Sequence, residues 1–210
     1  MEFIELAIRI IILLFSVVFH EVAHGWTAYA LGDPTAKYAK RLTLNPLKHL
    51  DPVGSVLVPL FLVLTRSPFL FGWAKPVPVN PRNFKDQKYG GAKVAIAGPL
   101  ANISLALIFG LILRFLPALY TVPGLASIFL YIVQINLILA VFNLLPVPPL
   151  DGSHILFTFL PRNAEKIKIF LSQYGLFVLI FIIFFLFQYI IQIVFWLMKL
   201  IIGISVVNAK

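Results

Sequence analysis

Long apolar runs alternate with short polar stretches along this chain. Four runs are long enough to cross a bilayer, at about residues 3–31, 94–116, 127–145 and 174–202. A spanning helix needs about 20 mainly apolar residues, because the hydrocarbon core of a bilayer is about 30 Å thick. The pattern therefore predicts an all-α polytopic membrane protein with about four transmembrane helices.

A further apolar segment, residues 53–72, is shorter and carries Pro59 in its first half. It leads into GWAKPVPVNP at 72–81, where repeated prolines favour an extended edge or a loop over a helix. We predict that 53–72 is a re-entrant or short apolar segment. We also expect small extended or β stretches at 38–44 and 72–81.

The composition supports one membrane unit. Hydrophobic residues make up 60% of the 210 residues, mean hydropathy is +0.97, and charged residues make up 12%, against about a quarter in soluble domains. No long polar block interrupts the chain, so we predict a single domain over residues 1–210. Cysteine is absent, which excludes disulfides and thiolate metal ligands.

The net charge of +9 indicates a membrane surface and not nucleic acid. Lys and Arg concentrate in 32–52, 75–93 and 162–168, whereas 117–126 carries no charge. Positively charged loops stay in the cytoplasm and contact anionic lipid headgroups. All three basic stretches are cytoplasmic if 53–72 enters the bilayer and returns. The N-terminus then lies outside, and we predict an integral protein of the cell (plasma) membrane.

The most unusual stretch is HEVAH at residues 20–24, deep in the first apolar run. His20 and His24 are four positions apart, so a helix projects both from one face, which suits two imidazoles on one zinc ion. Glu21 lies between them, placed to act as a general base in hydrolysis. In a soluble helix this motif is often a coincidence. Ionisable side chains within a span are costly, however, and indicate function.

A catalytic zinc normally takes three protein ligands, and the sequence offers several candidates for the third. Asp151 follows the proline-rich end of the 127–145 run. In the predicted topology it shares a leaflet with His24, which lies roughly 10 Å from the cytoplasmic end of its helix at 1.5 Å per residue. This agreement in depth places the active site towards the cytoplasmic side. The other candidates that remain open are His49, Asp51 and His154.

Three motifs together resemble one known family. HEVAH, AGPLAN at 97–102 and FNLLPVPPLDG at 142–152 are similar to the motifs of the site-2 protease family of intramembrane metalloproteases, peptidase family M50. RLTLNPLKHLDPVGS at 41–55 and GWAKPVPVN at 72–80 resemble its compact prokaryotic branch, which has no PDZ or CBS domain.

This resemblance implies an intramembrane zinc metalloendopeptidase with one Zn²⁺ per chain. The family's catalytic base corresponds to Glu21. Its two asparagines, which help to position the substrate or the oxyanion, correspond to Asn143 and Asn102. The residues that correspond to its zinc ligands are His20, His24 and Asp151.

The residues themselves allow two readings of these amides. An Asn in a span is either a donor in the site or a hydrogen-bond partner between helices. Helix packing is favoured for Asn102, and a site role is favoured for Asn143, close to Asp151. Asn136 and Gln134 match no motif, and we interpret both as interhelical partners.

The implied partners are a transmembrane protein substrate and the lipid bilayer, with no nucleic acid and no specified oligomeric state. A helical substrate must unwind before hydrolysis. The 72–81 stretch either pairs with the unwound strand by β-augmentation or only connects two helices. The alternative function is an intramembrane metal-binding protein or divalent-metal transporter without protease activity. The clustering of His20, Glu21 and His24 at one depth favours the protease.

Overall fold

Four long helical stretches dominate the computed structural model, which describes residues 2–65 and 73–203. Within the described residues, four are long and apolar enough to cross a membrane. They are α1 (Glu2–Ala30), α4 (Gly90–Phe115), α5 (Leu125–Asn143), and α7 (Glu165–Phe181) continued through Ile182–Leu186 into α8 (Phe187–Ile202). Each predicted apolar run falls on one of them, which confirms the all-α polytopic membrane architecture.

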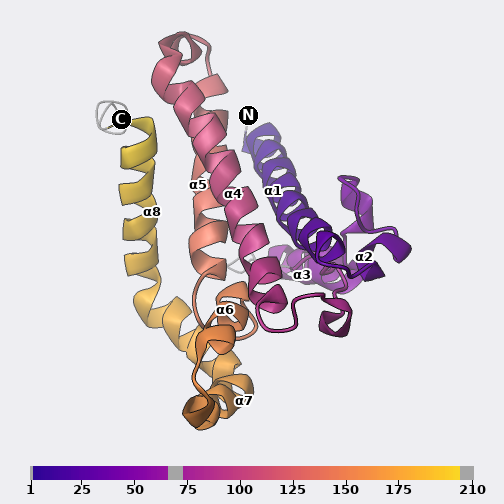
Figure 1. The fold of residues 1–210 in the computed structure, drawn as a ribbon. Helices are drawn as coiled ribbons and strands as arrows, with labels where there is room; N and C mark the ends of the chain where they lie inside the picture. The colour runs from indigo at the N-terminus through magenta and orange to yellow at the C-terminus, as the bar shows by residue number, and fades with distance from the viewer. Residues whose placement is uncertain (1, 66–72, 204–210) are drawn as a thin grey trace.

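Shorter helices connect these spans. The α-helical ones are α2 (Thr35–Tyr38), α3 (Val58–Leu64) and α6 (Asp151–Phe159). The 3₁₀ turns are Pro46–Lys48, Pro81–Asn83, Pro117–Thr121 and Arg162–Ala164, and a π-helical turn covers Pro52–Leu57. In Figure 1, α2, α3, α6 and α7 gather at the end of the bundle opposite to the N-terminus and the α4–α5 connection.

Helix α4 lies at the centre of the bundle and packs against α1, α5 and α8 (Figure 1). Leu113 of α4, Leu137 of α5 and Val194 of α8 belong to one buried cluster. Gly110 permits the close approach of α8, because a Cβ atom there would lie 2.5 Å from Cγ2 of Ile201. Small residues let backbones approach in membranes, where packing replaces the hydrophobic effect between helices.

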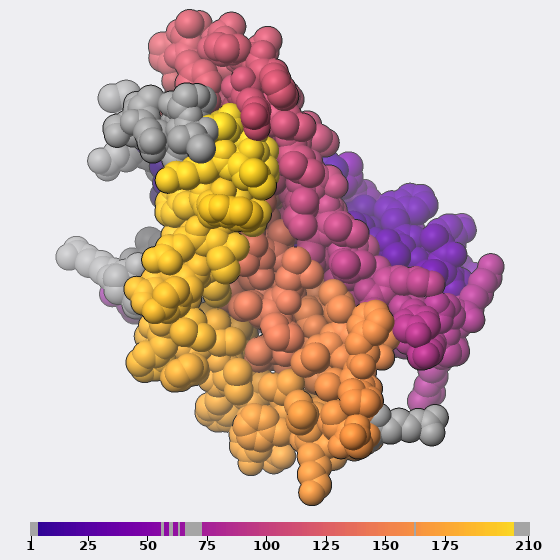
Figure 2. Space-filling model, turned by 60° about the vertical axis from the view of Figure 1, so that its left-hand side comes forward, coloured from indigo at the N-terminus to yellow at the C-terminus, as the bar shows by residue number. Residues whose placement is uncertain are grey.

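The outward surface of the last two helices is apolar. Figure 2 shows α8 in yellow running along α4 and α5. Large hydrophobic side chains are exposed along α7, the π-helical turn and α8, among them Phe177, Phe181, Phe184, Phe185 and Trp196. A water-exposed surface of this kind would be unfavourable. It therefore fits a lipid environment, as expected for a membrane-spanning bundle.

The last helix begins earlier than predicted and bends. The pattern predicts a span from 174 and a basic loop at 162–168, whereas the helix already begins at Glu165. The continuous stretch has 38 residues, or about 57 Å at 1.5 Å per residue, longer than the bilayer core of about 30 Å. A π-helical turn at Ile182–Leu186 interrupts the α-helix, and such turns are a recognised cause of kinks.

The predicted re-entrant segment starts and ends at one place. Trp73 N donates to Gly54 O at 3.1 Å, and Leu50 forms an isolated antiparallel bridge with Ala74. Both ends of the 54–73 segment therefore lie together, which agrees with an excursion that returns and not with a full span. The last part of this prediction, residues 66–72, lies outside the described residues.

The predicted strand at 38–44 is wrong. Pro34 precedes the short helix α2, and Asp33 Oδ1 accepts a hydrogen bond from Thr35 N at 3.1 Å. Lys40 then takes a positive φ of 54°, which turns the chain. A strand also needs a neighbour to pair with, and in the described residues the β-bridge lies further on, at residues 50 and 74.

Residues 73–83, which we call the Pro-rich segment, are held by hydrogen bonds across the C-terminal end of α1. The Arg41 guanidinium donates to Lys75 O at 2.7 Å, and Asn80 N donates to Asp33 Oδ2 at 2.7 Å. Burial alone would raise the pKa of Asp33, but hydrogen bonds from Thr35 and the Pro-rich segment outweigh it and lower this pKa. Asp33 is thus held as a carboxylate that anchors the segment.

Candidate metal centre

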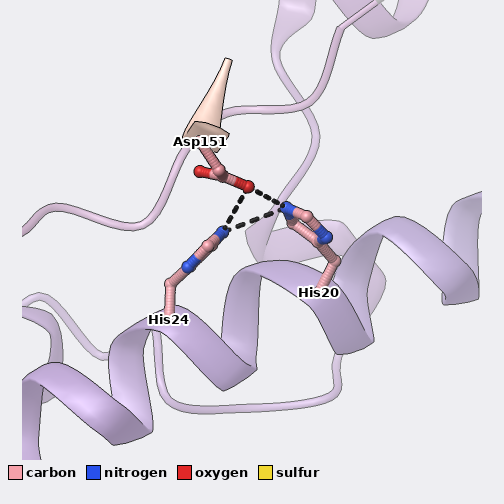
Figure 3. A group of neighbouring side chains, drawn as sticks. All are labelled: His20, His24 and Asp151. Carbon is pink, nitrogen blue, oxygen red and sulfur yellow. Dashed lines mark hydrogen bonds and ion pairs between the residues drawn. The ribbon is translucent and has the colours of Figure 1, made fainter. Parts of the chain in front are cut away.

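Three potential ligand atoms converge between α1 and the start of α6. His20 and His24 project from one face of α1, and Asp151, the first residue of α6, points at both (Figure 3). The two Nε2 atoms are 3.0 Å apart, and Asp151 Oδ2 lies 3.1 Å from Nε2 of His20 and 3.2 Å from Nε2 of His24. Among the described residues, this is the group of three His, Asp or Glu side chains whose ligand atoms lie within 4.8 Å of one another.

The chain leading into α6 explains why Asp151 reaches this position. A turn follows α5, and Gly152 packs onto it so closely that a Cβ would lie 2.3 Å from Leu144 O. Helix α7 supports the same turn from behind, since a Cβ at Gly175 would lie 2.7 Å from Pro148 O. Two glycines thus allow three chain segments to meet and aim the Asp151 carboxylate at α1.

Both imidazoles are held with their Nε2 lone pairs towards the centre. His24 Nδ1 lies 2.7 Å from the carbonyl oxygen of Val94. Because a carbonyl only accepts, Nδ1 carries the proton and Nε2 of the neutral ring is free. His20 Nδ1 lies 2.6 Å from Asn102 Oδ1, which gives the same tautomer. Such partners of Nδ1 are typical of metal-binding histidines.

The donor set fits a zinc ion. Two imidazole lone pairs and a carboxylate oxygen face one another, and the buried Asp151 Oδ2 has no hydrogen-bond partner. Converging lone pairs repel unless a cation lies among them. The separations of 3.0–3.2 Å are close to the value of about 3.3 Å between ligand atoms on a tetrahedral zinc with bonds of about 2.0–2.1 Å.

Helix α4 leaves room beside these candidate ligands because residue 98 is a glycine. A Cβ at Gly98 would lie 2.4 Å from Nε2 of His24 and 2.6 Å from Nε2 of His20. Such distances are well inside van der Waals contact. The absence of a side chain at Gly98 therefore keeps the space next to both imidazoles open.

Glu21 lies beside the centre and is fixed by the Pro-rich segment. Its Oε2 accepts a hydrogen bond from Val77 N at 2.7 Å. Glu21 lines the same cavity of about 440 Å³ as the three converging side chains, together with Asn143, His154 and residues of the Pro-rich segment. The carboxylate is thus oriented by a backbone amide, and no pattern in the sequence predicts this contact.

The other candidates for a third ligand are held elsewhere or stand apart. His49 is buried, with Nε2 2.9 Å from Thr43 O. Asp51 caps the π-helical turn by accepting from the backbone amides of Val53 and Gly54. His154 lines the cavity but is outside the group of three. Asp151 is therefore the carboxylate that the fold brings to the two histidines.

The two motif asparagines occupy different positions. Asn143 lines the cavity, and its Nδ2 donates to Leu139 O of its own helix at 2.9 Å. Asn102 is fully buried behind His20 and is not among the residues that line the cavity. Asn136, interpreted from the sequence as a helix-packing residue, contacts Asn102 directly. The geometry thus places Asn102 against a candidate ligand and Asn143 next to the open space.

The Pro-rich segment offers little for strand pairing. Lys75 N donates to His49 O, and Val77 N donates to Glu21. Pro76 and Pro78 have no N–H. Residues 75–78 therefore present no free backbone donor to an incoming strand, and β-augmentation needs donors and acceptors in alternation. These bonds favour a role in which residues 75–78 connect two helices and hold Glu21 in place, over a role in pairing with a substrate strand.

Comparison with known proteins identifies the family. The model of peptidase family M50 matches residues 118–186. "Putative zinc metalloprotease YwhC" of Bacillus subtilis is 43% identical over 173 residues, which cover 79% of this chain and 75% of that protein. "Putative zinc metalloprotease Rip2" of Mycolicibacterium smegmatis is 30% identical over 168 residues, or 80% of this chain and 62% of that protein. No solved structure gives a significant match.

The chain therefore belongs to peptidase family M50. It is a zinc metalloprotease of the intramembrane, site-2-protease type, and its described residues contain four helices long and apolar enough to cross a membrane. The family implies Zn²⁺ as cofactor, and His20, His24 and Asp151 form a group that could hold one ion.

Proposed function

We propose that the chain is an endopeptidase that cleaves peptide bonds within or near transmembrane segments of membrane-protein substrates, with His20, His24 and Asp151 as its zinc ligands. The observation that carries this proposal is the convergence of three lone pairs, 3.0–3.2 Å apart, in a cavity that also exposes Glu21. Zinc in such a site supplies Lewis acidity, which acidifies water and polarises a carbonyl.

Glu21 is proposed as the general base. Val77 N–H holds Oε2, so Oε1 is the oxygen available to take a proton from the attacking water. The same carboxyl then passes this proton to the departing amine nitrogen of the cleaved bond. Asn143 lines the cavity, and its Nδ2 has one hydrogen left beyond the bond to Leu139 O. We assign that hydrogen to the carbonyl oxygen of the bond under attack.

We also propose that the site faces the cytoplasmic side of the plasma membrane. The basic stretches 32–52, 75–93 and 162–168 belong to the same end of the bundle as α6, where Asp151 lies (Figure 1). Positive loops remain cytoplasmic. A substrate segment would therefore be cut near its cytoplasmic end.

The decisive experiment measures zinc and cleavage in the same purified preparations. Wild type should carry about one zinc per chain, and Asp151→Ala and His24→Ala should lose it. Glu21→Gln should keep the zinc yet lower cleavage of a membrane-protein substrate by at least about 100-fold, the lower range for a general base. The exposed carboxyl of Glu165 offers the matched control, and Glu165→Gln should change neither quantity.

Two results would contradict the proposal. Zinc retained in Asp151→Ala but lost in His154→Ala would make His154 the third ligand in place of Asp151. Cleavage retained in Glu21→Gln, with zinc present, would remove the general base from the mechanism.

A further inference from the structure

Three buried polar side chains lie behind His20, each from a different helix. Ser16 of α1 is 4% exposed, and Asn102 of α4 and Asn136 of α5 are 0% exposed. Polar groups at this depth are costly unless they are hydrogen-bonded. Their hydrogen bonds form one continuous network that ends on His20, a candidate metal ligand.

The orientation of the Asn102 amide follows from its neighbours. Its Nδ2 donates to the backbone oxygen of Ser16 at 3.2 Å and to Asn136 Oδ1 at 2.8 Å. A backbone oxygen can only accept, so the amide nitrogen must face it. Oδ1 consequently faces His20 Nδ1, at 2.6 Å, where it can only accept a hydrogen bond from the N–H of the ring.

The orientation of Asn136 is fixed in the same way. Its Nδ2 donates to Ile132 O at 2.9 Å and to Ser16 Oγ at 2.9 Å. This leaves Oδ1 of Asn136 as the acceptor for Asn102. Each hydrogen bond of this network therefore has a defined donor. His20 donates to Asn102, Asn102 donates to Asn136 and to Ser16 O, and Asn136 donates to Ile132 O and to Ser16 Oγ.

We propose that Asn136 and Ser16 are positioning residues of the metal centre, acting through Asn102 to hold His20 with its proton on Nδ1. This rests on the proposed function, in which His20 binds zinc through Nε2. Without the acceptor at Asn136, only the longer bond to Ser16 O, at 3.2 Å, still distinguishes the two orientations of the Asn102 amide, so the flipped orientation becomes less unfavourable. A flipped amide would put N–H against Nδ1, favour the other tautomer, and turn an N–H of His20 towards the metal.

A residue that only packs helices together would not have this consequence. Loss of a packing contact lowers stability, whereas loss of an orienting bond also weakens metal binding, typically by about 10–100-fold for residues that touch ligands. Since Asn136 acts one residue further away, we expect about tenfold weaker zinc binding in Asn136→Leu, the lower end of that range. Ser16→Ala removes one acceptor only and should have a smaller effect in the same direction.

The test uses the full chain in detergent, with zinc affinity measured by competition with a chelator and the absorption spectrum of Co²⁺ as a probe of the ligand geometry. Asn136→Leu and Ser16→Ala should bind zinc more weakly and change the Co²⁺ spectrum. Ser16→Thr keeps the hydroxyl and should restore both. Gln134→Leu on the same helix and Ser104→Ala, which removes an exposed hydroxyl bonded to Leu100 O, are the controls and should match wild type.

The outcomes separate this inference from the proposed function. Wild type without zinc, or His20→Ala with wild-type affinity, would overturn the proposed function. Wild type that binds zinc through His20, with Ser16→Ala and Asn136→Leu equal to the controls in affinity and Co²⁺ spectrum, would overturn the inference alone. If Asn136→Leu does not fold, as judged by circular dichroism, the milder pair Ser16→Ala and Ser16→Thr decides.

Discussion

At the scale of single residues, the candidate metal centre depends on a glycine, Gly98, as well as on the three proposed ligands. His20 and His24 are aimed by acceptors on α4, namely Asn102 and the Val94 carbonyl, while Gly98 on the same helix leaves their Nε2 atoms accessible. The sequence identified the two histidines by their spacing. It did not reveal the function of Gly98, because the contact joins helices far apart in the chain.

Gly98 gives a prediction with an internal control. Gly98→Ala should lose most of its zinc, with affinity reduced at least about tenfold, because the new methyl would lie 2.4 Å from Nε2 of His24. Gly91→Ala, on the same helix with open space around its Cα, should bind zinc as wild type does. Zinc titration of both variants checks this, and equal affinity in Gly98→Ala would show that α4 does not approach the ligands as described.

At the scale of elements, the Pro-rich segment connects the polar turns that follow α1 to Glu21, the proposed general base. Arg41 and Asp33 fasten its two halves, and Val77 N contacts Glu21 between them. The repeated prolines predicted an extended conformation, and the segment does lack helix apart from Pro81–Asn83. Its partner could not be predicted, because an unpaired N–H leaves no signature in a sequence.

The hydrogen bond from Val77 can be removed with little change in backbone conformation. Val77 precedes Pro78 and is already restricted to extended backbone, so Val77→Pro chiefly deletes the N–H. A hydrogen bond to a charged group is worth about 1.5–3 kcal/mol, so cleavage should fall by roughly tenfold to 100-fold while zinc is retained.

Val77→Ala is the matched variant, because it trims the side chain and keeps the N–H. Its rate of cleavage should stay well above that of Val77→Pro. Equal rates in the two variants, with zinc bound in both, would mean that the backbone amide does not orient Glu21.

At the scale of the whole molecule, the bundle places the basic stretches 32–52, 75–93 and 162–168 at one end and the uncharged α4–α5 connection at the other (Figure 1). The chain has no cysteine, so single cysteines can report this topology without background. In intact spheroplasts, a membrane-impermeant maleimide should label Ala118→Cys, in the α4–α5 connection, and not Lys88→Cys. Permeabilised spheroplasts should label both, and the reverse pattern in intact ones would invert the proposed orientation of the site.

The sequence by itself determined the membrane class, the four spans and the His20–Glu21–His24 motif, because hydrophobic periodicity and helical spacing are local properties. The sequence-based prediction placed a strand at 38–44, where a short helix and a turn occur, and began the last helix at 174 in place of Glu165. Both errors fall in polar stretches, where the pattern of apolar residues does not distinguish a helix from a strand or a loop. Among Asp151, His154, His49 and Asp51, residue types and spacing left the third ligand open, and the family resemblance implied Asp151. Only the tertiary structure showed Asp151 against two histidines 127 or more residues away, because that contact depends on how α5, α6 and α7 pack.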